Sequence, residues 1–168
     1  MKQGITRRER EVTDLNEIQA ILDGAKIVHI GLVDGDEPYV VPMNYGYTME
    51  EGKLTLYLHA ALWGRKLDVI RVNPKVFFSI ECDVQPFDGP VACHYGTAYS
   101  SVMGRGTAVI LEDVEEKKAG LSRFMKSQTG LDFTFEDKMV SIVSVIRIDV
   151  ADFTAKRRPM PEAHTGNT

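Results

Sequence analysis

Short strand-like segments separated by turn sequences constrain the fold of this chain more than any other feature. Residues 26–33, 39–47 and 54–59 are rich in apolar and β-branched side chains, and Asp34-Gly-Asp36 and Glu50-Glu-Gly52 lie between them. Turns of this kind join antiparallel neighbours in β-hairpins. The pattern therefore predicts a mostly antiparallel sheet.

The rest of the chain adds strands and helices to this sheet. Apolar spacing predicts strands over 76–81, 99–111 and 140–150. Helices are expected over 14–24 and 61–71, and a third is expected to begin at the capping residue Asp113. Pro42 removes a ladder donor, so it should stand at an edge or a bulge. The order predicts an α+β fold, mainly antiparallel β, that is compatible with a barrel.

Length and charge exclude several classes of protein. The 168 residues correspond to about one domain, which we place at 1–158 with a flexible tail at 159–168. Lys and Arg number 20 against 24 Asp and Glu, which argues against a nucleic-acid partner. Apolar stretches fall well short of the roughly 18 residues of a membrane span. We therefore expect a cytoplasmic protein with no membrane partner, and we expect both cysteines, Cys82 and Cys93, to be small buried side chains.

The segment around Gly64-Arg-Lys66 is the strongest candidate for a ligand site. Arg65 and Lys66 fall in the first turn of a predicted helix, whose N-terminus is already positive, at a cost of roughly 0.3–1 kcal/mol. A bound phosphate would reverse that sign, because free N–H groups, a guanidinium and an ammonium would converge on it. Gly64 would let the backbone approach the ligand. The alternative is a pair of solvated surface cations.

Two further segments are candidates for contacts with a ligand. In 40–47, Pro42 frees backbone groups from the ladder and Asn44 offers a donor and an acceptor, which suits a flat polar heterocycle. The alternative is an edge strand protected from aggregation by its proline. In 93–106, small hydroxyl residues beside Tyr99 could meet a phosphate or a ring edge, or could simply lead from a loop into a strand.

Taken in order, these segments resemble the FMN-binding split-barrel proteins related to pyridoxamine 5′-phosphate oxidase, and within them the nitroimidazole-resistance type. The matching pieces are Arg7-Arg-Glu-Arg10, residues 30–38, residues 41–47, Leu58-His-Ala-Ala61 with Gly64-Arg-Lys66, and Tyr99-Ser-Ser-Val102. The resemblance implies a six-stranded split β-barrel with flanking helices. It also implies a homodimer with two FMN molecules at the subunit interface.

The resemblance also assigns roles to residues. It implies that the ring system contacts the backbone segment Val41, Pro42, Met43 and Asn44, and that the ring and ribityl chain run beside His59, Ala60 and Ala61. It implies that the phosphate is bound by Arg65 and Lys66, which follow Gly64. It further implies that the flavin is reached, from the same or the partner chain, by Tyr99, Ser100, Ser101 and Val102. His59 matches a histidine near the cofactor and is the candidate catalytic residue. The family often has Ser at Ala60 or Ala61 and Arg at Ser100, so this chain departs from it there.

The resemblance implies an FMN-dependent oxidoreductase that reduces small aromatic or nitroaromatic acceptors with NAD(P)H. The alternative is a protein of the same fold that binds FMN, haem or a deazaflavin without turnover. In that case His59 or His94 could ligate a haem iron. No metal-ligand spacing is present, so we expect no other metal site.

Overall fold

The computed structural model describes residues 5–161. Within this range one antiparallel sheet has the strand order β3-β2-β6-β7-β8-β5-β4, and the short strand β1 pairs with β8. The strands are β1 (Glu11–Val12), β2 (Ile27–Asp34), β3 (Glu37–Asn44), β4 (Gly46–Glu50), β5 (Lys53–Ala60), β6 (Lys75–Phe87), β7 (Gly96–Leu111) and β8 (Ser144–Arg158). The helices are η1 (Arg8–Arg10), α1 (Leu15–Gly24), α2 (Arg65–Val72), η2 (Ala92–His94), α3 (Val114–Thr129) and α4 (Asp137–Val140).

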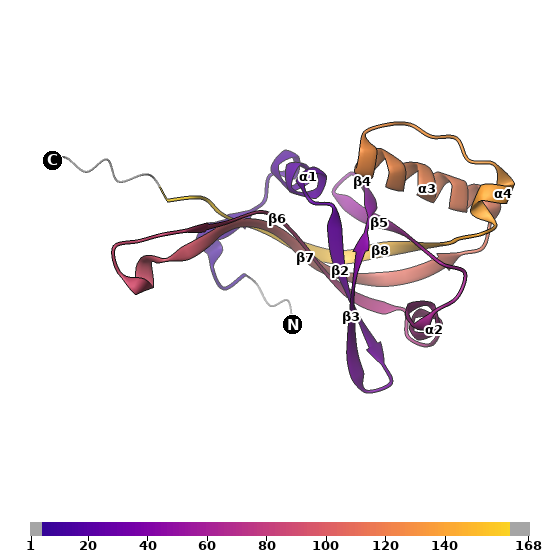
Figure 1. Cartoon of the computed structure of the whole chain (residues 1–168), viewed down its shortest axis with the longest axis horizontal. Coiled ribbons are helices and arrows are strands. Elements are labelled where there is room, and N and C mark those ends of the chain that lie inside the picture. Colours follow the sequence, from indigo (N-terminus) through magenta and orange to yellow (C-terminus); the bar gives the residue numbers. More distant parts are fainter. Residues whose placement is uncertain (1–4, 162–168) are drawn as a thin grey trace.

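The sheet curls around one apolar core but does not close (Figure 1). Strands β3 and β4 stand at its two ends and are not hydrogen-bonded to each other, although they follow one another in the chain. We call the opening between β3 and the β4–β5 edge the seam. Six strands of eight or more residues build this split barrel, which confirms the predicted α+β, mainly antiparallel class.

Alternation along the strands decides what the barrel contains. Ile30, Phe78 and Ile80 point inward and are at most 2% exposed. Helices α1 and α2 pack against opposite ends of the strands, and the Tyr45 hydroxyl donates to the Leu22 carbonyl oxygen of α1 at 2.6 Å. Helix α3 covers the outside of β4, β5 and β8 (Figure 1). No helix within residues 5–161 is long and apolar enough to cross a membrane.

Helix ends follow the capping signals of the sequence. The Asp14 carboxylate accepts the N–H groups of Asn16 and Glu17, and Asp113 accepts that of Glu116. Gly130 ends α3 in the left-handed conformation, with φ at 75°. Helix α2 begins at Arg65 rather than at residue 61, because the chain turns first and Gly64 takes a φ of 146°.

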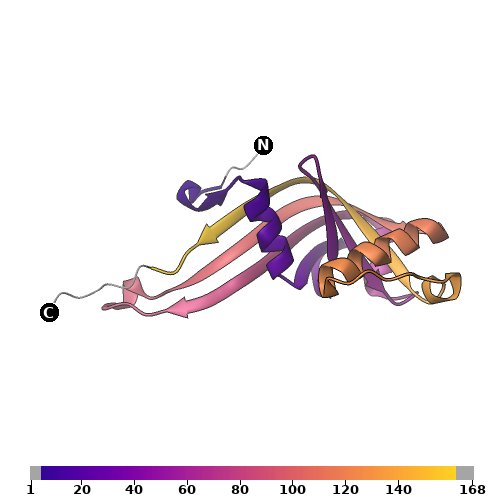
Figure 2. The same cartoon turned by 90° about the horizontal axis from the view of Figure 1, so that it is seen from above.

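Three long strands run beyond the barrel as an arm, formed by the ends of β6, β7 and β8 (Figure 2). A bulge lies between Cys82 and Gln85 on β6, and the register between β7 and β8 shifts beside Arg105 and Gly106, where the extra residue is Ala151 of β8. A β-carbon on Gly104 or Gly106 would lie 2.5 Å from a carbonyl oxygen of β8, so the close backbone approach that these glycines predict is confirmed. The predicted loop over 85–90 is wrong in its first part, because β6 stays paired with β7 up to Phe87.

Two other predictions are corrected here. Strand β8 begins at Ser144, because residues 137–140 form the short helix α4. Cys93 is exposed at the tip of the arm and Cys82 is only partly buried, so the expectation of two buried thiols is wrong. Of the predicted tail over 159–168, residues 162–168 lie outside the described part of the chain.

Candidate functional site

The turn from β5 into α2 forms an exposed corner, which we define as residues 61–66. The N–H groups of Leu67 and Asp68 both bond to the Gly64 carbonyl, at 2.9 and 3.3 Å. The N–H groups of Arg65 and Lys66 have no acceptor among residues 5–161. A β-carbon placed on Gly64 would meet no atom within 4 Å, so the corner opens to solvent. Two free donors therefore point out of the start of α2.

Arg65 is tied to the turn between β2 and β3. Its Nε donates to Asp34 Oδ2 at 2.8 Å, and its guanidinium lies 4.6 Å from the centre of the Tyr39 ring. The hydrogen bond to Asp34 raises the pKa of Arg65 above its ordinary value. Arg65 therefore links α2 to the hairpin, and a phosphate would have to share it with Asp34.

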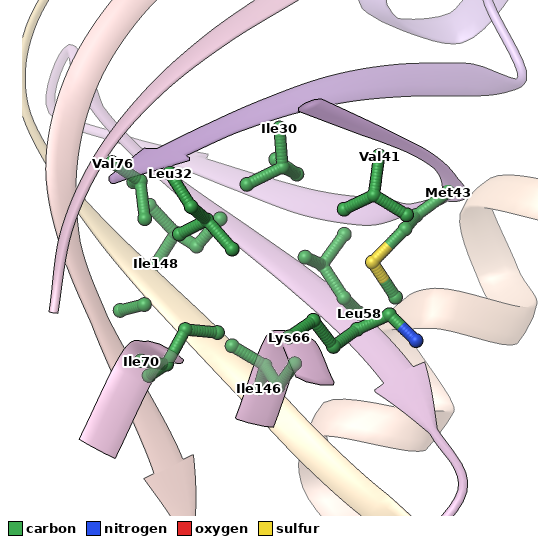
Figure 3. A pocket seen from close by; sticks show the side chains of 11 residues that line it. Ile30, Leu32, Val41, Met43, Leu58, Lys66, Ile70, Val76, Ile146 and Ile148 are labelled. Carbon is green, nitrogen blue, oxygen red and sulfur yellow. The ribbon is translucent and has the colours of Figure 1, made fainter. Parts of the chain in front are cut away.

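Lys66 extends in a different setting from Arg65. Its stem lies against the apolar interior, where Figure 3 shows the ammonium beside Met43 and Leu58. Among residues 5–161 the Lys66 ammonium has no hydrogen bond or ion pair, so its charge is available for a ligand. The cavity beside it is only about 10 Å³, which is room for about one water molecule. A planar ring system therefore has no room in this cavity, and a ligand of that shape would lie outside the barrel.

Strand β3 ends the sheet, so its edge at the seam has no strand partner among residues 5–161. The β2–β3 ladder runs without a break through Pro42, which stands opposite His29. Since proline has no N–H and antiparallel residues alternate in the direction of their bonds, the backbone groups of Val40, Pro42 and Asn44 point away from β2. The side chains of Val41 and Met43 point inward (Figure 3).

Asn44 has its amide engaged within the chain. Its Nδ2 donates to the Lys26 carbonyl oxygen at 3.2 Å and lies 3.4 Å from Gln128 Oε1. Gln128 Nε2 in turn donates to the Tyr45 carbonyl oxygen at 2.7 Å. The side chain of Asn44 thus fastens β3 to the end of α3, and its backbone is the part left for a ligand.

His59 lies on the outer side of β5. Its ring meets Phe124 of α3 edge-on, with the ring centres 4.8 Å apart, and it is exposed. Ala60 points into the core and Ala61 is exposed in the corner. His59 is therefore close to the corner along the chain but faces α3 rather than the barrel interior.

The segment Tyr99, Ser100, Ser101 and Val102 does not join the corner within one chain. Val102 is level with Met43 through Ile80 and Val28, three strand spacings away, or about 14 Å. Across Val145 of β8, His59 of β5 is level with Leu111 of β7. Ser101 lies ten residues before Leu111, which is about 30 Å along the strand. Ser100 and Ser101 are buried, and Ser100 Oγ accepts from Arg157 Nε at 3.3 Å.

Sequence reasoning did not single out the outer face of β2, β3, β6 and β7. It carries exposed Val40, Phe77 and Met103. His29 Nδ1 lies 3.4 Å from Glu81 Oε2, and Ser79 Oγ donates to the same carboxylate. The signal was present in the sequence, because Phe77 and Phe78 are adjacent in a strand and must point to opposite faces. We call this surface the outer apolar face.

Within residues 5–161 no group of three or more His, Cys, Asp or Glu side chains is placed to hold a metal ion. The hydrogen-bond donors at the corner suit an anion, and the backbone groups along β3 suit the polar edge of a ring. The arrangement can therefore hold a phosphorylated, planar ligand outside the barrel.

Three solved structures illustrate what the chain is similar to. A candidate 5-nitroimidazole antibiotic resistance protein from Bacteroides thetaiotaomicron is 31% identical, with a TM-score of 0.74 over 88% of this chain and 86% of the other. The flavocytochrome Anf3 from Azotobacter vinelandii is 20% identical, with a TM-score of 0.76 over 95% and 75%. An FAD- and haem-binding protein from Mycobacterium smegmatis is 14% identical, with a TM-score of 0.74 over 88% and 73%.

The likenesses to the flavocytochrome and to the FAD- and haem-binding protein show the fold alone. A search of curated proteins finds no match. The family model described as pyridoxamine 5′-phosphate oxidase matches residues 14–157, a range that contains the corner, the β3 edge and residues 99–102. This chain belongs to the pyridoxamine 5′-phosphate oxidase family.

Proposed function

We propose that this protein is a homodimeric FMN-dependent oxidoreductase that passes electrons from NAD(P)H to small aromatic or nitroaromatic acceptors. The observation that carries the proposal is the group of donors at the corner. The Lys66 ammonium, which has no partner among residues 5–161, lies beside Met43 of β3, and the N–H groups of Arg65 and Lys66, also without an acceptor in that range, lie in the same turn. These donors fit a phosphate and the polar edge of a flavin.

Each group of residues has its own task in this proposal. The start of α2 and Lys66 bind the phosphate, with Arg65 sharing its guanidinium between the phosphate and Asp34. The backbone of β3 at Val40, Pro42 and Asn44 orients the ring system. FMN supplies the electron-transfer chemistry, while the protein supplies binding, orientation and shielding.

A second copy of the chain completes the site in this proposal. Residues 99–102 lie too far from the corner to meet the same flavin within one chain. The outer apolar face carries the half-exposed side chains that an interface between two copies would cover. In such a dimer we expect residues 99–102 of the second copy to contact the flavin.

The likeness to a candidate nitroimidazole-resistance protein supports the choice of nitroaromatic acceptors. His59 remains the residue proposed to act near the ring, since it lies at the end of β5 just before the corner. The non-catalytic alternative predicts a bound flavin that NAD(P)H does not reduce.

The test is spectroscopic. The purified protein should gain flavin absorbance on titration with FMN, NADH or NADPH should bleach it, and a nitroaromatic compound should restore it. Saturating FMN should also raise the melting temperature through linkage. A protein that takes up no FMN contradicts the proposal, and one that takes it up without reduction supports the non-catalytic alternative.

A further inference from the structure

Three polar side chains gather on the outer apolar face, where β2 and β6 lie side by side. His29 of β2 pairs with Ser79 of β6, and Glu81 follows two residues later on the same side of β6. His29 Nδ1 lies 3.4 Å from Glu81 Oε2, and Ser79 Oγ donates a hydrogen bond to Glu81 Oε1. The carboxylate thus joins a hydroxyl and an imidazole in one group, which we call the His29 cluster.

The imidazole of His29 has one nitrogen beside the carboxylate and one that is free. A carboxylate at Nδ1 forms an ion pair with the protonated ring and fixes its orientation, as a third group does for a histidine that transfers protons. Among residues 5–161, Nε2 has no hydrogen-bond partner, and the side chain is 46% exposed. Nε2 is therefore open to a molecule bound on this face.

The His29 cluster borders the strand that is proposed to hold the flavin ring. His29 stands opposite Pro42 of β3 in the ladder. Because the backbone groups of Pro42 point away from β2, the two residues form a narrow pair, with α-carbons about 4.5 Å apart and side chains on the same face. A ring whose polar edge meets the backbone of Pro42 outside the barrel is therefore one strand away from His29.

The charge beside the imidazole is that of Glu81. The outward side chains of β2 and β3 around it are uncharged: Ile27, Gly31, Val40, Pro42 and Asn44. Beyond Glu81 the same row continues through Ser101 of β7 to Lys156 of β8. This lysine is two strand spacings from Glu81, or about 10 Å. An anionic partner, rather than a cation, therefore stands next to the ring.

The proposed reaction consumes a proton at the acceptor. Reduction of a nitro group to a nitroso group takes one hydride and one proton, breaks one N–O bond and releases the oxygen as water. NAD(P)H supplies the hydride equivalent by way of the flavin, so the proton must come from the protein or from solvent. A side chain placed to donate it accelerates such a step by about 10²–10⁴-fold.

We propose that protonated His29 is the catalytic proton donor, giving its Nε2 proton to the oxygen that leaves the acceptor, and that Glu81 and Ser79 position its ring. This inference rests on the proposed function and adds a residue to it. After the transfer the imidazole is neutral and takes a proton from water. His59 differs from His29, because among residues 5–161 it has no carboxylate within ion-pair distance and its ring meets Phe124.

The main experiment separates the two halves of the reaction in the FMN-loaded protein by anaerobic stopped-flow absorbance. His29→Gln should keep the wild-type affinity for FMN and the wild-type rate of reduction by NAD(P)H. Its reoxidation by para-dinitrobenzene should be about a hundredfold slower. The wild-type reoxidation rate should fall as the pH rises from about 5 to 8, because the imidazolium is lost, and His29→Gln should not show this dependence.

Glu81→Gln tests the positioning role, since it keeps the shape of the side chain and removes its charge. It should slow reoxidation less than His29→Gln does and should retain the pH dependence. Glu115→Gln, at an exposed glutamate of α3, is the matched control and should change no rate. Equal reoxidation rates in His29→Gln and wild type overturn the inference while the flavin site stands. A wild type that takes up no FMN, or that NAD(P)H does not reduce, overturns the proposed function itself.

A second measurement needs no turnover. The chain has 4 histidines, so its imidazole C–H signals in proton NMR are few, and the signal missing from His29→Gln identifies His29. Titration of the flavin-free protein with FMN should shift that signal, because a flat aromatic ring shifts the resonances of protons close to it. A His29 signal that FMN leaves unchanged overturns the inference. So does a His29→Gln protein that has lost the oligomeric state of the wild type, because His29 would then act through the subunit contact.

Discussion

The inner and outer faces of β6 place two adjacent phenylalanines in different surroundings. Phe78 points into the barrel and is fully buried, whereas its chain neighbour Phe77 points outward and is 50% exposed. An outward phenylalanine stays exposed to water unless a partner covers it, as the core of the chain covers Phe78. In the proposed dimer, the second copy of the chain would cover Phe77.

The largest expected effect is on the inner face. Phe78→Ala leaves a cavity in the core and should lower the free energy of unfolding by about 3–5 kcal/mol. Phe77→Ala is the matched control, because it removes the same ring from the outer face. Urea unfolding monitored by circular dichroism at low protein concentration separates the two. Equal losses would contradict the assignment of the faces.

A charge on the outer face should act on assembly instead. Phe77→Lys places an ammonium beside Gly31 of β2 and Arg105 of β7, and it should turn the proposed dimer into a folded monomer. Sedimentation velocity measures the change. Val72→Lys adds the same charge to an exposed apolar site on α2 and should leave the dimer intact. A dimer that survives Phe77→Lys would place the interface elsewhere.

The third effect concerns Lys66, which lies between β3 and β5. Lys66→Met keeps the stem but removes the ammonium, and it should weaken FMN binding by roughly 1.5–3 kcal/mol, the range for a charged hydrogen bond. Arg65→Ala with Lys66→Ala should weaken it further. Lys53→Met, at the other end of β5, is the control for loss of one positive charge. Unchanged affinity in Lys66→Met would locate the phosphate away from this corner.

The smallest effect is a difference between the two thiols. Burial and, next, the hydrogen bond to Asp83 raise the pKa of Cys82 to about 11, whereas Cys93 is exposed at the tip of the arm. At pH 8 only about a thousandth of Cys82 is thiolate, so a disulfide reagent should label one thiol per chain quickly. Labelling of Cys82 should speed up as the pH rises toward 11. Cys93→Ser should abolish the fast phase. Labelling of both wild-type thiols at the same rate would contradict the partial burial of Cys82.

Local signals in the sequence predicted much of the fold. The hairpin turn at Gly35, the caps at Asp14 and Asp113 and the position of Pro42 at an edge each depend on neighbours in the chain, and the structure confirms them. The pairing of Gln85–Phe87 was missed because their Pro and Asp neighbours resemble a loop, while their partners on β7 lie 9 to 13 residues later. Long-range pairing overrode the local signal there.

The candidate site was less accessible to sequence reasoning. The spacing of Arg65 and Lys66 predicted two cations at a helix start, and both are there. Nothing local indicated that Asp34, 31 residues earlier, holds Arg65, or that Lys66 lies along the core. The exposure of Trp63 could not be predicted either, because it depends on what the surrounding elements leave uncovered.

Strand β8 follows every other strand in the chain, yet it pairs with β1, β5 and β7. During synthesis the ribosome releases the two halves of the sheet before the strand that joins them. Until Ser144–Arg158 has emerged, the edges of β5 and β7 that β8 covers have no strand partner and are open to pairing with other chains. Folding of this protein is therefore expected to be largely post-translational and slow for its size, as pairings between distant segments require.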